Sequence, residues 1–404
     1  RDRQATAGGA GPVTERPGPL AGVRVVDFTA NTSGPFGTMI LGDQGADVIK
    51  VEAPTGDVIR TIGTQRARMS GYFANLNRSK RSIALDLTRP EARPVIDALL
   101  DSADVVVVNY RPGVAASLGL DAESVRRTRP QVIHAEVIGF ADTGPYGGRP
   151  AYDHIIQALA GFVATQTDPK TGTPVLVRQA VVDKATGQVT AQAVTAALFE
   201  RTRTGAGRAL QIRMLDVALA FIWPDGMMDH TLLDPEVVMP SIANSFRLTP
   251  TKDGHIAFIV ATGAQWARLL AATGIDDGGL MGTMEGQMRH GGRFMREVVA
   301  VLSRQTTDEV VELLAGIDVP VAPVVRLDEV HDHPQVRADG AIDEFDHPVV
   351  GPVRQANPAV RFDGEHAAAL PPAPALGQHT DEVLAELGFR PAAISRLRDD
   401  KVVR

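Results

Sequence analysis

The chain contains no cysteine, and this absence excludes several kinds of chemistry at once. Disulfide bridges, thiol catalysis and zinc sites built from cysteine are all ruled out. The 404 residues also include no apolar run long enough for a membrane-spanning helix, which needs about 20 residues. The first residues lack the basic-then-apolar pattern of a secretory signal. We therefore expect a cytoplasmic protein that does not associate with membranes.

Basic residues are fewer than acidic ones, and the formal net charge is -7. This balance argues against a general nucleic-acid-binding protein. Residues 58–85 are an exception, since they contain six Arg or Lys residues and no acid. The basic run predicts a local anion site, although a solvated basic face is the more common explanation of such a run.

Short β-branched runs alternate with helical patterns through the first half of the chain. Strands are expected at residues 23–28, 47–51, 105–108 and 132–137, and helices at residues 36–44, 90–100, 151–162 and 187–203. Such alternation predicts a parallel sheet with right-handed crossovers. The expected fold class is therefore α/β, with a large Rossmann-like parallel-sheet domain over residues 20–222.

The pattern changes after residue 222, and we expect a smaller α+β domain over residues 223–330. A hairpin is expected at residues 246–260, around a Lys-Asp-Gly turn. A helix is expected at residues 307–315, opened by the capping pair Thr306 and Glu309.

The two ends of the chain are rich in turn-forming residues. Residues 1–19 are rich in Gly, Pro and Ala and are expected to form a mobile leader. Residues 331–404 are expected to form a Pro-rich extended linker and a C-terminal helix at residues 381–387. This tail is expected to return to the large domain or to cross onto a partner chain.

Polar residues adjoin two of the expected strands. Residues 77–82, with the sequence NRSKRS, precede the apolar run 83–85, and residues 109–113, with the sequence NYRPG, follow the strand at 105–108. Arg, Lys and Asn beside a parallel sheet suit a phosphate-bearing ligand such as the ADP part of CoA. A nicotinamide dinucleotide is not favoured, because residues 27–37 lack the G-x-G-x-x-G pattern.

Several acidic and histidine residues allow both a structural and a catalytic interpretation. Asp183 follows the β-branched run 175–182 and precedes a helix expected near Thr186, so it suits either a helix N-cap or a carboxylate nucleophile. Tyr152, Asp153 and His154 open an apolar helix, where a cap with a packed tyrosine is the simpler explanation. The histidines of the run His-Asp-His-Pro, residues 331–334, have too few carboxylates nearby to suggest a metal site.

Several segments together resemble the class III CoA-transferases. This family includes formyl-CoA transferase, carnitine CoA-transferase, the bile-acid-inducible F protein and α-methylacyl-CoA racemase. The segments that carry the resemblance are PLAGVRVVDFT (19–29), LGDQGADVIKVE (41–52), NRSKRSIALDL (77–87), ADVVVVNYRPG (103–113), AYDHIIQALAG (151–161), VVDKATG (181–187), RTRTGAGRALQI (201–212), VPVAPVVRLDEVHDHPQVRA (319–338) and LGQHTDEVLAELG (376–388).

The resemblance implies an enzyme that transfers CoA from an acyl-CoA to a small carboxylic acid, with Asp183 as the covalent nucleophile. It implies no metal and no redox cofactor, and a homodimer of two interlocked subunits. Substrate contacts are expected at Tyr152, Asp153 and His154. Contacts to CoA are expected at Thr32, Arg60, Asn77, Arg78, Lys80, Arg81, Asn109, Tyr110 and Arg111.

Two departures from the family pattern bear on the reaction. The racemase branch has a histidine at the position of Tyr152, and a tyrosine is a poor proton shuttle at neutral pH. The formyl-CoA branch has Gly and Glu at the positions of Val182 and Asp153, so the substrate need not be formate or oxalate. Racemisation with Asp183 and either Asp153 or His154 as proton carriers is the first alternative, and a non-catalytic CoA-binding protein is the second.

Overall fold

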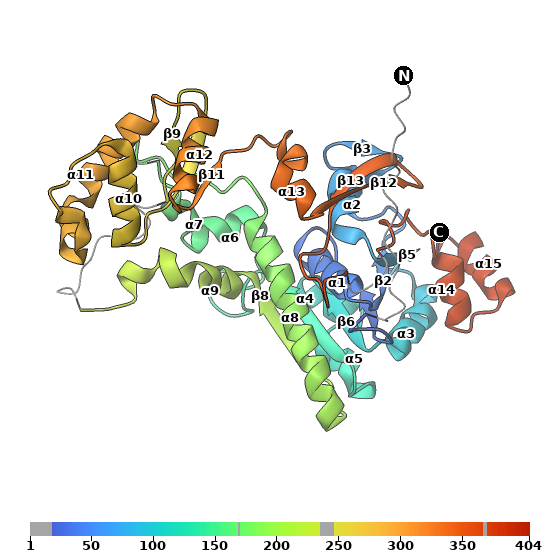
Figure 1. The fold of residues 1–404 in the computed structure, drawn as a ribbon. Coiled ribbons are helices and arrows are strands. Elements are labelled where there is room, and N and C mark those ends of the chain that lie inside the picture. The colour runs from blue at the N-terminus through green and yellow to red at the C-terminus, as the bar shows by residue number, and fades with distance from the viewer. Residues whose placement is uncertain (1–17, 169, 235–245, 367–369) are drawn as a thin grey trace, which may run out of the picture. The chain divides into compact units, whose positions relative to one another are not determined.

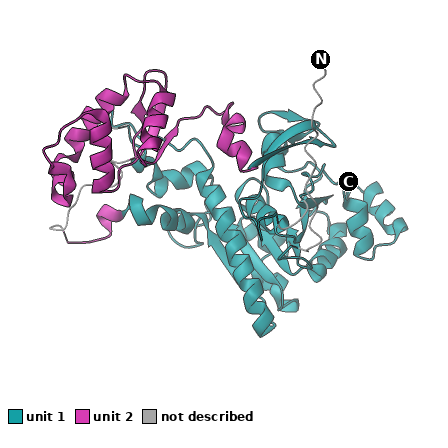
Figure 2. Cartoon of the chain, in the orientation of Figure 1, with its two compact units in different colours: residues 1–227, 341–404 teal, residues 228–340 magenta. Residues whose placement is uncertain are grey.

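The computed structural model divides the chain into two units, which Figure 2 shows in different colours. It describes residues 18–168, 170–234, 246–366 and 370–404. The expected leader at residues 1–19 therefore lies almost wholly outside the described residues. The first unit comprises Arg1–Met227 and Ala341–Arg404, and the second comprises Met228–Gly340. The units thus change at Met227 and Gly340, whereas the expected domain limits were residues 222 and 330.

The first unit is built around a parallel sheet of six strands in the order β5-β2-β1-β6-β7-β8. The strands are β1 (Arg24–Asp27), β2 (Asp47–Glu52), β5 (Lys80–Ala84), β6 (Val105–Val108), β7 (Ile133–Ile138) and β8 (Ala209–Arg213). Numbered along the chain this order is 3-2-1-4-5-6, that of a doubly wound dinucleotide-binding fold. The expectation of a Rossmann-like parallel sheet is confirmed.

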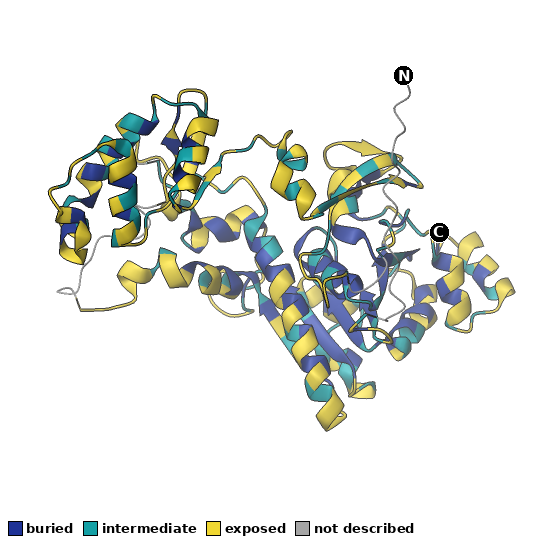
Figure 3. Cartoon of the chain, in the orientation of Figure 1, coloured by how far each residue is buried: buried dark blue, intermediate teal, exposed yellow. Residues whose placement is uncertain are grey.

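The strands of this sheet are largely buried (Figure 3), and an apolar cluster covers each of its faces. Val25 and Val48 pack with helix α8, whereas Val26 and Ile49 pack with helix α3 and the C-terminal helices on the other face. Because both faces of the sheet are covered, apolar and polar residues need not alternate, and β6 consists of four consecutive buried valines. The helices around the sheet are α1 (Ser33–Asp43), α2 (Gly71–Asn77), α3 (Arg93–Ser102), α4 (Pro112–Ser117), α5 (Ala122–Thr128), α6 (Asp153–Leu159), α7 (Phe162–Thr165), α8 (Val181–Thr204) and α9 (Met214–Gly226).

Helices α1 and α8 approach each other closely, and glycines make this approach possible. A Cβ atom on Gly37 would lie 2.9 Å from the carbonyl oxygen of Gly187, and one on Gly187 would lie 2.8 Å from that of Ser33. Neither contact leaves room for a side chain. The N-terminal turns of the two helices are therefore held side by side, which matters for the site described below.

The C-terminal segment packs on the first unit with more regular structure than expected. Part of the expected linker forms the antiparallel hairpin β12 (Ile342–His347) and β13 (Gly351–Ala356). The expected last helix is α14 (Thr380–Glu386), and an unexpected helix, α15 (Pro391–Asp399), follows it.

Short elements elsewhere in this unit are η1 (Val58–Thr61), β3 (Gln65–Arg66), β4 (Met69–Ser70) and η2 (Pro90–Ala92).

The second unit is a small α+β structure with its own apolar core. Its sheet has the order β11-β10-β9 and is antiparallel. Thr306 and Glu309 form the expected capping box. The elements are η3 (Met228–His230), β9 (Thr249–Pro250), β10 (His255–Phe258), α10 (Gly263–Thr273), η5 (Leu280–Gly282), α11 (Met284–Leu302), α12 (Thr307–Gly316), β11 (Val321–Pro323), η6 (Val330–Asp332) and α13 (Pro334–Ala338), labelled where there is room in Figure 1. In neither unit do the described residues form a helix that could cross a membrane.

Candidate active site

A pocket of about 200 Å³ lies where the strand order of the large sheet reverses, at the carboxyl ends of β1 and β6. Open α/β sheets bind ligands at this switch point because the adjacent loops diverge there. The pocket is lined by residues that follow β1, β6 and β7, and by the starts of helices α8 and α9. They are Asn31, Ser33, Asn109, Tyr110, Arg111, Pro112, Val137, Ile138, Gly139, Phe140, Asp142, Gly148, Arg149, Pro150, Ala151, Tyr152, Asp183 and Met214.

Asp183 lies in this pocket, in the first turn of α8. The helix begins at Val181, earlier than expected, and Ala180 is its N-cap. The interpretation of Asp183 as the N-cap residue is therefore wrong. Ser33, at the start of α1, lines the same pocket. The positive end of the α8 dipole favours an anion at the position of Asp183.

Asp153 fixes the backbone of Asp183. Asp153 is 8% exposed, and its Oδ2 accepts a hydrogen bond of 2.9 Å from the backbone N–H of Asp183. Its Oδ1 accepts from Nε2 of Gln157 at 2.5 Å. Gln157 also donates to the carbonyl oxygens of Val177 and Gln179 and accepts from the N–H of Val177. The start of α6 therefore sets the path of the chain into α8.

The surroundings of Asp183 make its carboxyl group less acidic than usual. Burial raises its pKa to about 7, the negative charge of Asp153 acts in the same direction, and the hydrogen bond from Ser33 opposes them. A carboxyl group with such a pKa changes its ionisation near neutral pH. Its reactivity as an anion is then controlled by pH.

We expect any reaction that needs ionised Asp183 to rise with pH, because a smaller fraction is ionised below a pKa of about 7. Steady-state rates measured from pH 5 to pH 9, on the order of two units to each side of that value, should follow one ionisation and level off at high pH. The variant Asp153→Asn removes the neighbouring charge and should move the midpoint to lower pH. A profile that is flat across this range would contradict the assignment.

Tyr72 was missed in the sequence, where nothing marks it. Its hydroxyl lies 2.6 Å from Oγ1 of Thr32, the N-cap residue of α1. Burial raises the pKa of Tyr72, the Thr32 hydrogen bond opposes this shift, and the charges of Asp183 and Asp153 add to it. Tyr72 therefore keeps its proton at neutral pH and lies within electrostatic reach of the acid pair.

Apart from Thr32, which contacts Tyr72, the expected CoA contacts separate into two groups, and the first lines the pocket. Asn109, Tyr110 and Arg111 lie there, and Asn109 also exchanges hydrogen bonds of 3.0 and 2.7 Å with the backbone of Ala30. Arg149 was not expected in this group. Its guanidinium carbon lies 4.5 Å above the ring centroid of Tyr146. Arg111 and Arg149 are both exposed and bring positive charge to the pocket.

The members of the second group do not line the pocket, and the anion site expected on the basic run stays a prediction. The side chains of this group bind carboxylates of the same chain, so their charges are neutralised internally. The pairs are Arg60 with Glu52 at 2.7 Å, Arg78 with Asp43 at 2.7 Å, Lys80 with Asp27 at 3.0 Å, and Arg81 with Asp47 and Glu386 at 2.7 Å each. Asn77 is buried and accepts a hydrogen bond from Lys80. The alternative of a solvated basic face is also wrong for Arg60, Arg78 and Lys80, which are buried.

Of the three expected substrate residues, Tyr152 and His154 are exposed, whereas Asp153 is buried. Tyr152 lines the pocket and is 58% exposed, so it is available for contact. His154 is exposed, and its ring lies parallel to that of Tyr152 at a centroid distance of 6.4 Å. Within the described ranges, no group of three or more His, Asp and Glu side chains could hold a metal ion.

Comparison with known proteins identifies the family of the chain. The model of CoA-transferase family III matches residues 20–380. The chain is 32% identical to succinyl-CoA:glutarate CoA-transferase of Mus musculus, over 98% of this chain and 94% of that protein. It is 32% identical to succinate–glutarate CoA-transferase of Agrobacterium fabrum, over 91% and 96% of the respective chains.

Solved structures agree with this assignment. The crystal structure of Rv3272 from Mycobacterium tuberculosis matches with a TM-score of 0.79 and 30% identity, over 91% of this chain and 99% of that one. The chain therefore belongs to CoA-transferase family III and is a CoA-transferase.

Proposed function

We propose that the protein moves CoA from an acyl-CoA thioester to a free carboxylic acid through covalent intermediates on Asp183. The Asp183 carboxylate attacks the thioester carbonyl, the carbon–sulfur bond breaks, and CoA thiolate leaves. The thiolate then attacks the aspartyl carbonyl of the acyl-aspartyl anhydride, which releases the first acid and forms an aspartyl-CoA thioester. The second acid repeats these two steps in reverse, and Asp183 is regenerated as a carboxylate.

One observation carries this proposal: Asp183 lies in the first turn of α8 at the switch-point pocket of a family III chain. Asp183 is half-buried, which limits the access of water that would hydrolyse the anhydride. The N–H groups at the start of α8 favour negative charge that develops on the attacked carbonyl oxygen. Tyr72 supplies a further protonated hydroxyl near the acid pair.

The acids exchanged should be identified by direct assay. The relatives named for succinyl-CoA and glutarate make this pair the first to test. The purified protein would be incubated with succinyl-CoA and a panel of mono- and dicarboxylic acids, and new thioesters would be detected by mass spectrometry. Formation of a new acyl-CoA that depends on the acid supports transfer. Thioester hydrolysis alone, with every acid tested, would contradict it.

The isomerase alternative needs a second proton carrier beside Asp183. Asp153 is poorly suited, because Gln157 and the Asp183 N–H occupy both of its carboxylate oxygens. Exchange of the α-hydrogen of a 2-methylacyl-CoA with deuterated solvent, in the absence of any acceptor acid, would favour this alternative over transfer.

The CoA-binding part of the proposal rests on Arg111 and Arg149, which bring positive charge to the pocket. Replacing either by Ala should weaken CoA binding by about 1–3 kcal/mol if the guanidinium meets a phosphate. Isothermal titration with CoA and with dephospho-CoA would show which phosphate is involved. Arg89→Ala removes an exposed arginine paired with Glu91 and should leave CoA affinity unchanged. Native affinity in both pocket variants would place the phosphates elsewhere.

The interlocked homodimer stays a prediction from the family resemblance. Exposed apolar side chains on unit 1 are consistent with burial against a second copy. They include Phe199 on α8 and Phe221 and Trp223 on α9, which are 64%, 55% and 44% exposed.

A further inference from the structure

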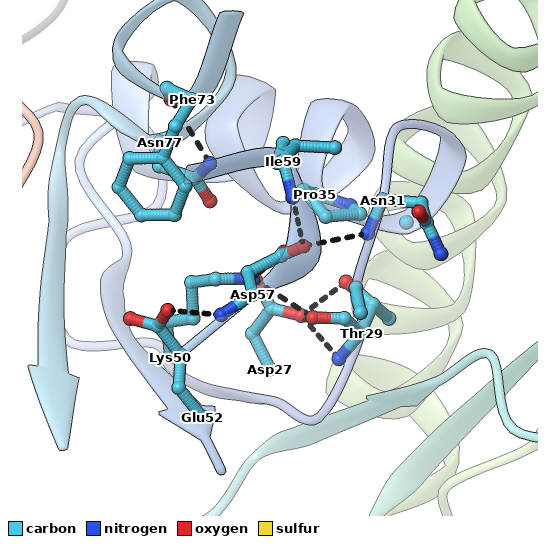
Figure 4. A network of polar contacts seen from close by, with 12 residues as sticks. Asp27, Thr29, Asn31, Pro35, Lys50, Glu52, Asp57, Ile59, Phe73 and Asn77 are labelled. Carbon is cyan, nitrogen blue, oxygen red and sulfur yellow. Dashed lines mark hydrogen bonds and ion pairs between the residues drawn. The ribbon is translucent and has the colours of Figure 1, made fainter. Parts of the chain in front are cut away.

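A network of buried charges lies beside the candidate active site, between β1, β2, β5 and η1 (Figure 4). It contains the ion pair Lys50–Asp57 at 3.1 Å and the ion pair Lys80–Asp27 at 3.0 Å. The exposed fractions of these four side chains are 1% or less. Burying charges is costly even when they are paired. Such a network is expected to hold neighbouring parts of the chain in place.

The network holds the backbone of the loop that joins β1 to α1, residues 28–32. Nζ of Lys50 donates to the carbonyl oxygen of Thr29 at 2.8 Å, and Oδ1 of Asp57 accepts from the N–H of Asn31 at 3.2 Å. Asp27 accepts from the N–H of Thr29 at 2.9 Å. Polar groups of this loop are thus bound by three charged side chains of the network.

The same loop has a strained backbone. Asn31 has a φ of 66°, in the left-handed region that non-glycine residues rarely adopt. Such a conformation persists where the surrounding structure determines it strongly, and it is common at functional sites. The hydrogen bond from Asn31 to Asp57 is one such constraint.

The two residues after Asn31 lead directly to the reacting group. Thr32 hydrogen-bonds with Tyr72, and Ser33 lines the same pocket as Asp183, where its hydroxyl acts to lower the pKa of that carboxyl group. Asn31 and Ser33 also line the pocket. A change in the path of residues 29–31 would therefore move the hydroxyl group that contacts the proposed nucleophile.

We propose that Lys50 and Asp57 are positioning residues, whose ion pair fixes the loop at residues 28–32 so that Ser33 meets Asp183. The proposal rests on the role proposed above for Asp183. Oδ2 of Asp57 is buried and lies 3.1 Å from Nζ of Lys50. Burial disfavours the charged form of Lys50, but Asp57, Asp27 and Glu52 outweigh burial and raise its pKa. Lys50 therefore carries its positive charge at neutral pH.

The test removes both charges together, because a single substitution would leave an unpaired ion inside the protein. In Lys50→Met/Asp57→Ala, the loop loses its bonds at Thr29 and Asn31. Asp183 should then lose the influence of the Ser33 hydroxyl, which acts to lower its pKa, and the midpoint of its titration should rise. The acid–base groups that otherwise face Asp183 are Asp153 on α6 and Tyr72 on α2, and neither is changed.

The midpoint is measured by infrared titration of the protein with isotopically labelled aspartate, using Asp183→Asn to assign the carboxyl band. Ser33→Ala should raise the midpoint by the same amount as the pair variant, and combining the two should produce no further rise. Turnover should fall by about 10- to 100-fold from the lost alignment, with CoA affinity retained. The control Arg78→Met/Asp43→Ala removes a buried pair of similar exposure that does not bind this loop, and its midpoint should equal that of the native protein.

A native midpoint in the pair variant, or additive shifts when it is combined with Ser33→Ala, would overturn the proposal. Should the pair variant not fold, Asp57→Glu provides a second test, because it keeps the charge but displaces the carboxylate from the N–H of Asn31. Its midpoint should also rise, and an unchanged midpoint would count against the proposal. The infrared titration needs no turnover, so a protein without transferase activity still reports whether the pair positions Ser33.

Discussion

Replacing Asp183 by Asn is expected to reduce CoA transfer by about 10³-fold or more, because the substitution removes the attacking oxygen anion. Asn has nearly the same size and leaves the backbone N–H that Asp153 binds. Fold and CoA affinity should therefore persist, and the loss should appear in kcat. Thermal unfolding and CoA titration on the same preparation would separate lost chemistry from lost structure.

The matched control is Asp121→Asn. Asp121 is the N-cap of α5, and its carboxylate accepts a hydrogen bond of 3.0 Å from the N–H of Ser124. Asn and Asp cap helices about equally well, so this variant should keep native stability and activity. Comparable losses in both variants would indicate a general effect of replacing acids at helix starts.

Chemical trapping identifies the reacting residue independently. Hydroxylamine added to the native protein with an acyl-CoA should convert the activated carboxyl group to a hydroxamate, detected as a mass shift in the peptide that contains Asp183. Label on another carboxylate, or an active Asp183→Asn variant, would remove the central claim.

Much of the large sheet could be predicted from the sequence, because its strands are short runs of β-branched residues that are buried on both faces. The run of four valines at 105–108 gives strand β6 with the expected bounds. The start of α8 was harder to place. Residues 177–180 include a β-branched residue yet form no strand, because Gln157, from another helix, binds their backbone. The local sequence pattern of residues 177–180 does not reveal a hydrogen-bonding partner that lies in another helix.

The pairing of charges around the site also could not be predicted from the local sequence. The basic run at residues 58–85 is visible in the sequence, but the acids that pair with Arg60, Arg78 and Lys80 lie elsewhere in the chain. Asp27 and Glu52 belong to strands β1 and β2, and Asp43 ends helix α1. Only the sheet order brings these strands together. Tyr72 was missed for the same reason, since it reaches the site through contact of α2 with Thr32.

Replacing Lys80 by Met is expected to reduce the free energy of unfolding by about 3–5 kcal/mol, because it leaves the buried carboxylate of Asp27 without its closest cation. Lys80 also donates to the carbonyl oxygen of Pro35 and to Oδ1 of Asn77, and both bonds would be lost. The double variant Asp27→Asn/Lys80→Met, which removes both charges, should be less destabilised. Denaturation in urea would give the values.

The exposed pair Arg93–Asp97 on α3 is the control for surface charge. Both side chains are more than 40% exposed, and replacing Arg93 by Met should cost less than about 1 kcal/mol. A loss from Lys80→Met no larger than this one would contradict the assignment of Lys80 to a buried pair.

The pH dependence of the Lys80→Met variant follows from the carboxyl group that it leaves unpaired. In the native protein, burial acts to raise the pKa of Asp27, but Lys80, Lys50 and the hydroxyls of Thr29 and Thr38 outweigh burial and lower it to about 2. Its stabilising contribution is therefore complete above the ordinary value of 3.8 and is lost as the pH falls through about 2.

Without Lys80 the balance shifts toward burial, and the pKa of Asp27 should rise. If it rises above the ordinary value of 3.8, the folded protein takes up a proton that the unfolded chain does not, and the variant recovers stability as the pH falls through the raised pKa. The difference in unfolding free energy between native protein and variant should therefore be largest at neutral pH and smaller near pH 5, on the order of two units lower. A difference that is constant over this range would show that lost packing, rather than the unpaired carboxylate, causes the destabilisation.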